Sequence, residues 1–114
     1  MSHSGLLVGN IYFDKPVNMD LVNKIVELLE LPDPINYKSY NEFLLHYKSE
    51  NSYCALIEHP DEIELAFVNL DWGSHIGEEE FNELEKCKPL VKGAWVSYYY
   101  LEEPNLNFQY MLNQ

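Results

Sequence analysis

The alternation of apolar and polar side chains along this chain strongly restricts its fold. Between residues 53 and 67 the pattern has a period of two on both sides of a turn at Pro60 and Asp61, which predicts a β-hairpin. Residues 106–112 alternate in the same way, and with residues 93–102 they form a second predicted hairpin. Two hairpins in one short chain predict a sheet that is mainly antiparallel.

The remaining elements follow from apolar spacing and from helix start signals. Residues 6–13 carry apolar side chains at odd and even positions, which is typical of a strand buried on both sides. Three helices are predicted: one capped by Asn18, one with Ser39 and Glu42 as a capping box, and one that follows Gly77. The expected order is β-α-α-β-β-α-β-β.

This order predicts an α+β fold in a single domain over residues 1–114. We expect about five strands, with three helices mainly on one face of the sheet. A chain of 114 residues can bury roughly two-thirds of its unfolded surface. We expect one core formed by Leu21, Ile25, Leu28, Phe43, Leu44, Leu56, Ile57, Leu65, Phe67, Phe81, Leu84 and Val96.

The charge of the chain excludes several classes of partner. All seven basic residues are lysines, and they face 19 acidic residues, which gives a net charge of -12. Without arginine, and with a strongly negative field, direct binding to nucleic acid or to an anionic membrane is disfavoured. No run of 18 apolar residues occurs, and residues 1–5 lack the pattern of a signal peptide, so we expect a cytoplasmic protein.

Reactive side chains give no pattern that identifies a catalytic site. Cys54 and Cys87 are isolated, and we expect free thiols with no disulfide between them. The chain has no nucleophile elbow, phosphate loop, dinucleotide fingerprint or zinc-ligand spacing. We therefore expect no enzyme activity, no cofactor and no metal. We interpret His3, His46 and His59 as solvated side chains.

Acidic residues are concentrated between residues 61 and 85, where the sequence contains nine of them and no lysine. One interpretation is a solvated surface with glutamates at a helix start. The other is a binding surface for a basic protein, in which carboxylates speed association and aromatic side chains anchor the complex. The candidate partner-binding residues are Glu62, Glu64, Asp71, Trp72, His75, Glu78 and Glu79.

In size, acidity, alternating strands and this acidic and aromatic segment, the chain resembles the small α+β immunity proteins of bacteria. It is also similar to the barstar family, because an early helix ends at Leu31 and Pro32 and a short loop leads to a second helix before a strand. The C-terminal hairpin departs from that family, and no residue role is carried over from it. The resemblance implies a protein that neutralises a nuclease-type toxin.

Two other functions are compatible with the sequence. A phage anti-defence protein could imitate nucleic-acid phosphates with rows of carboxylates and so inhibit a nuclease. A small enzyme or ligand-binding module could use residues 98–100, three consecutive tyrosines, as an aromatic wall. The sequence leaves the oligomeric state and the identity of the partner open.

Overall fold

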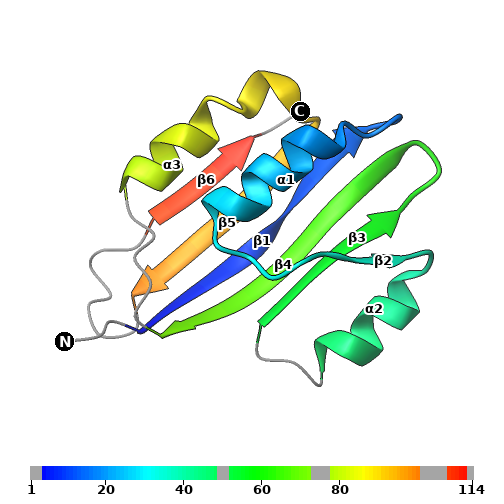
Figure 1. The fold of residues 1–114 in the computed structure, drawn as a ribbon, viewed down its shortest axis with the longest axis horizontal. Coiled ribbons are helices and arrows are strands. Elements are labelled where there is room, and N and C mark those ends of the chain that lie inside the picture. The colour runs from blue at the N-terminus through cyan, green and yellow to red at the C-terminus, as the bar shows by residue number, and fades with distance from the viewer. Residues whose placement is uncertain (1–3, 49–51, 73–77, 101–107, 113–114) are drawn as a thin grey trace.

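The longest strands of the protein lie next to one another at the centre of one sheet. The computed structural model describes residues 4–48, 52–72, 78–100 and 108–112, with side chains described for 5–48, 52–70 and 78–99. β1 (Ser4–Asp14) pairs antiparallel with β4 (Glu62–Trp72) on one side and with β5 (Gly93–Tyr100) on the other. The strand order is β2-β3-β4-β1-β5-β6 (Figure 1).

Both predicted hairpins are confirmed, and one strand was not expected. β3 (Ser52–Glu58) pairs with β4, and β5 pairs with β6 (Phe108–Leu112), in each case antiparallel. β2 (Ile35–Tyr37) lies at the edge of the sheet and runs parallel to β3, so the sheet has six strands and one parallel pair. Pro32 and Pro34 disfavour helix and keep this connection extended, which lets it pair with β3. The α+β class is confirmed.

The first two helices begin at the residues that the sequence predicts. α1 (Met19–Leu28) is capped by Asn18, whose side chain accepts hydrogen bonds from two backbone N–H groups of the first turn. α2 (Tyr40–Tyr47) is capped by Ser39, whose Oγ accepts the Glu42 N–H at 3.3 Å. These side chains satisfy N–H groups that have no partner within the helix.

The third helix, α3 (Glu78–Glu85), starts with three glutamates and is followed by a 3-10 turn at Lys88–Leu90. The predicted cap at Gly77 lies outside the described residues. α1 and α3 lie side by side across the sheet, whereas α2 lies beside β3 and away from both (Figure 1). None of the helices in the described part of the chain is long and apolar enough to cross a membrane.

The expected single core is wrong, because the sheet separates two clusters of buried side chains. The larger cluster lies under α1 and α3, on what we call the α1–α3 face. Its members include Leu7, Ile11, Ile25, Leu56, Leu65, Phe67, Phe81, Leu84, Val96 and Tyr98. The smaller cluster lies on the opposite face, the α2 face, and comprises Tyr37, Phe43, Tyr53, Ala55, Ile57 and Ala66. Strand alternation causes this split, because Ala66 and Phe67 point to opposite faces.

Candidate functional site

A groove of about 260 Å³ lies between α2 and the strands on the α2 face. Four side chains of α2 form one wall, β1 and β4 form the floor, and β5 forms the far side. The side chains that line it include Val8, Asn10, Tyr40, Phe43, Leu44, Tyr47, Glu64, Ala66 and Trp95. Glu64 is the only acidic residue among these lining residues. We call this feature the Glu64 groove.

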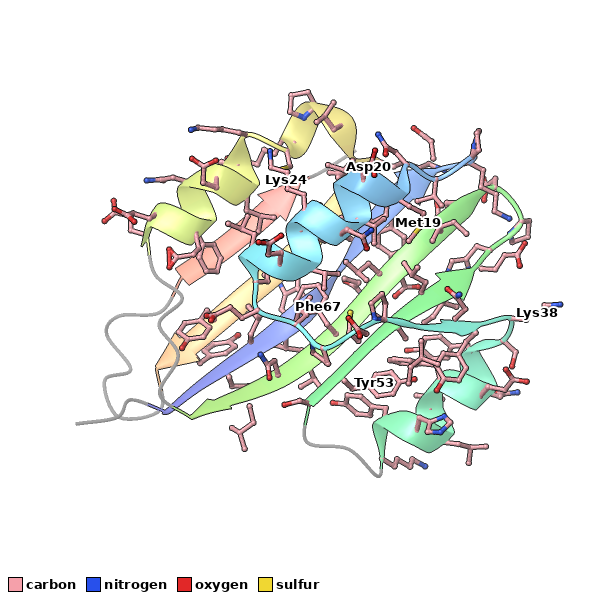
Figure 2. All side chains as sticks on the ribbon, viewed as in Figure 1. Met19, Asp20, Lys24, Lys38, Tyr53 and Phe67 are labelled. Atoms are coloured by element: carbon pink, nitrogen blue, oxygen red, sulfur yellow. The ribbon has the colours of Figure 1, made fainter. Side chains whose placement is uncertain are left out.

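The aromatic wall is built around Phe43. This residue is buried, and its ring meets the ring of Tyr53 edge-on with 5.4 Å between centroids. Tyr53 points from β3 toward α2 in Figure 2. Tyr40 and Tyr47 lie one helical turn before and after Phe43, with ring centroids 5.3 Å and 5.8 Å from its ring. Both tyrosines are exposed, so they give the groove an aromatic rim that solvent and a partner can reach.

Glu64 is a buried carboxylate, with an exposed fraction of 5 %. β4 places it on the α2 face, opposite Tyr12 of β1 and Ile57 of β3. The Asn10 Nδ2 donates to its Oε2 at 3.3 Å, and the His59 Nε2 lies 2.8 Å from its Oε1. These two contacts hold the carboxylate in one orientation at the floor of the groove.

The potential around Glu64 is negative, as Tyr12 shows. The pKa of the Tyr12 hydroxyl is raised above its ordinary value, first by burial and then by the charges of Glu64 and Glu62. A neighbouring negative charge opposes ionisation of a phenol, and it equally favours a bound cation. The carboxylates of Glu64 and Glu62, which contribute to this rise, also make this part of the sheet attractive to a positive charge.

Glu62 lies two residues before Glu64 at the start of β4 and is already paired. The Lys92 Nζ lies 3.0 Å from the Glu62 Oε1 and 3.8 Å from the Asp61 Oδ2. The sequence predicts that the acidic side of this arm faces water. For Glu64 that expectation is wrong, because α2 and the neighbouring strands cover it.

The predicted partner-binding residues do not form one region. Glu62 and Glu64 lie at the start of β4, whereas Asp71 and Trp72 lie at its end, roughly 23–33 Å away over seven to ten residues of extended strand. There the backbones of Asp71 and Trp72 pair with the start of β1, and their side chains lie outside the described part of the structure.

A third group of predicted residues lies on α3, apart from both ends of β4. Glu78 and Glu79 are exposed in the first turn of α3, which covers the α1–α3 face. In Figure 1 that helix starts beside β6, and β1 and β5 lie between β6 and β4 in the sheet. His75 falls outside the described residues. The structure therefore keeps Glu62 and Glu64 together and separates them from the other candidates.

Two of the histidines that we interpret as solvated make specific side-chain contacts. His59 contacts Glu64, as described above. His46 is exposed, but its Nδ1 lies 2.5 Å from the Tyr37 hydroxyl, and its ring stacks at 19° to the ring of Tyr53. His46 therefore fixes α2 to β2 and β3. His3 lies outside the described residues.

Sequence reasoning missed His59, which contacts Glu64, and the groove residues Asn10, Tyr40, Tyr47 and Trp95. The signal for His59 was present, because five residues and a tight turn separate it from Glu64 in a hairpin. Pairing of Ile57 with Glu64 places His59 at the same face of the sheet. No comparable signal links Asn10 or Trp95 to Glu64, since strand pairings between distant segments bring them together.

A buried carboxylate between aromatic side chains is suited to binding a cation. In the described part of the chain, no three His, Cys, Asp or Glu side chains converge as the ligands of a metal ion. Comparison with protein-family models, curated proteins and solved structures gave no match. The geometry and charge of the Glu64 groove are therefore the features that indicate a function for this chain.

Proposed function

We propose that this chain is a non-catalytic, acidic protein that binds a basic protein partner through its α2 face. The observation that carries the proposal is the Glu64 groove, in which a fixed, buried carboxylate lies between exposed aromatic side chains. Protein interfaces commonly place aromatic anchors near desolvated polar groups and surround them with residues that contribute little. The groove has this composition.

The net charge supports a basic partner. A chain with a charge of -12 attracts a positively charged protein over distances up to about one Debye length, roughly 8–10 Å, which raises the association rate. Glu78 and Glu79 contribute to this long-range attraction although they lie away from the groove. Nuclease clefts are positively charged because they hold phosphate. The partner class that we propose is therefore a nuclease-type toxin, which the chain would neutralise as a cytoplasmic immunity protein.

The phosphate-mimic alternative has less support. Such an inhibitor needs rows of free carboxylates over much of one face. On α3, however, Lys86 lies 2.8 Å from Glu83 and Lys88 lies 2.8 Å from Glu85. These lysines interrupt the negative surface of the helical layer.

The ligand-module alternative is also less well supported. The three tyrosines at residues 98–100 do not form one wall, because Tyr98 is fully buried on the α1–α3 face and Tyr99 follows on the other face. The volume of the Glu64 groove is below the range of about 300–1,000 Å³ that is typical of sites for drug-sized ligands. It is better suited to part of a protein partner than to a cofactor.

The proposal can be tested with a panel of purified bacterial ribonuclease and deoxyribonuclease toxin domains. The panel should contain basic and acidic members, with cleavage of labelled RNA or DNA as the readout. We expect inhibition of at least one basic nuclease at a molar ratio near one, and weaker inhibition when salt is raised. Failure to inhibit any member at a large molar excess, or equal inhibition of the acidic members, would contradict it.

A further inference from the structure

We infer that the Glu64 groove receives a single arginine side chain of the partner. This inference rests on the proposed function, because it specifies which group of a basic protein occupies the groove. It follows from the acceptor geometry of Glu64, from the aromatic rim and from the absence of arginine in this chain.

Glu64 offers two acceptor sites that match a guanidinium group. A carboxylate has two oxygens with about four acceptor positions in total. Asn10 uses one position on Oε2, and His59 uses one on Oε1. Each oxygen thus has a second acceptor position, and a planar guanidinium can donate to both oxygens at once. An ammonium group has no such paired geometry.

The aromatic rim favours the same group. Tyr40, Tyr47 and Trp95 line the groove and are 52 %, 42 % and 40 % exposed. A guanidinium stacks on aromatic rings and is more weakly hydrated than an ammonium, so it loses less on leaving water. Arginine is therefore favoured over lysine as the side chain that enters.

The occupant must come from a different protein. This chain contains no arginine, so neither its own residues nor a second copy can supply the guanidinium. Charge complementarity points in the same direction, because a partner that presents arginine is attracted by the overall charge of -12.

Short blocked peptides test the inference without knowledge of the partner. We would titrate the full chain with acetyl-Gly-Arg-Gly-amide and with versions that carry lysine or citrulline, and follow backbone amide signals by NMR. Citrulline has nearly the shape of arginine but no charge. We expect the arginine peptide to bind in the millimolar range, with shifts at Asn10, Tyr40 and Trp95. The lysine peptide should bind more weakly, and the citrulline peptide at least about tenfold more weakly.

Three variants locate the site. Glu64→Gln and Trp95→Ala should each weaken the arginine peptide several-fold, and Trp95→Ala leaves the buried carboxylate and its partners in place. Glu58→Gln is the matched control, since it removes one charge from the neighbouring strand at an exposed position and should leave binding unchanged. No arginine-dependent shift up to about 20 mM peptide, or equal binding of the arginine and lysine peptides, would overturn the inference.

The peptide titration and the nuclease panel test two separate claims, so one claim can be contradicted while the other stands. If a basic nuclease is inhibited equally by the wild type and by Trp95→Ala, the proposed function stands and the arginine site is wrong. If the arginine peptide binds at the groove and no basic nuclease is inhibited, the arginine site stands and the toxin-neutralising function is wrong.

Discussion

Glu30 occupies a backbone conformation that disfavours its side chain. It follows the end of α1 with φ at 53°, in the left-handed region. The N–H of Leu31 bonds to the Val26 carbonyl at 2.9 Å, and the N–H of Glu30 bonds to the Glu27 carbonyl at 3.1 Å. This is a Schellman ending, in which glycine is the preferred residue at the position of Glu30.

Glu30→Gly should therefore stabilise the fold by about 1 kcal/mol, because glycine adopts this conformation without steric cost. Glu27→Gly is the matched control: it lies within α1, is exposed, and should lower stability by about 1 kcal/mol. Urea unfolding of both variants measures the difference. If Glu30→Gly lowers stability as much as the control, the proposed strain at Glu30 is wrong.

The buried thiol of Cys54 predicts a loss of stability in alkali. Burial, assisted by the charge of Asp33, raises the pKa of Cys54 from 9.0 to about 12. Above pH 9 the thiol ionises in the unfolded chain and stays protonated in the folded chain, so rising pH favours unfolding. The stability that Cys54 contributes as a protonated thiol is fully present below pH 9. Between pH 9 and pH 12, ionisation of the thiol in the unfolded chain lowers the free energy of unfolding by up to about 1.4 kcal/mol per pH unit.

Urea unfolding between neutral pH and the alkaline limit checks this effect. We expect the stability of the wild type to fall more steeply with pH than that of Cys54→Ala. The alanine variant is less stable at every pH because it leaves a cavity, but it has no thiol to ionise at residue 54. Parallel pH profiles for the two proteins would contradict the predicted role of Cys54.

At the scale of elements, local signals were sufficient for most of the fold. Asn18 and Ser39 cap the helices that their positions predict, and the turn at Pro60 and Asp61 joins β3 to β4. β2 could not be predicted, because three residues carry no periodicity of their own and depend on pairing with β3. The second core could not be predicted for the same reason, because packing between distant segments decides which face of the sheet α2 covers.

Phe43 is the one buried side chain of α2, and together with His46 it attaches this helix to the sheet. Phe43→Ala should destabilise the protein by about 3–5 kcal/mol, because it removes a buried ring that contacts Tyr53. Leu45→Ala, on the same helix but 73 % exposed, should change stability by less than about 0.5 kcal/mol. Urea unfolding compares the two. Similar small effects would show that α2 is not anchored through Phe43.

For the whole molecule, the composition gives the net charge but does not show where the charged side chains lie in the fold. The sequence identified Glu64 as a candidate because it lies in an acid-rich segment, but in the fold it is a buried group between Asn10 and His59. The eleven residues from Glu62 to Trp72 form one extended strand, so proximity in sequence did not become proximity in space. Only the register of β1 with β4 and β5 brings Asn10 and Trp95 to the groove.

The central claim is that the partner binds at the Glu64 groove. It is tested most directly by comparing two variants that each remove one negative charge, Glu64→Gln in the groove and Glu79→Gln at the start of α3. The measurement is the inhibition constant of each against a basic nuclease that the wild type inhibits. We expect Glu64→Gln to raise this constant at least about tenfold, and Glu79→Gln by less than about threefold through weaker long-range attraction. An equal effect of the two variants, or a larger effect of Glu79→Gln, would contradict binding at the groove.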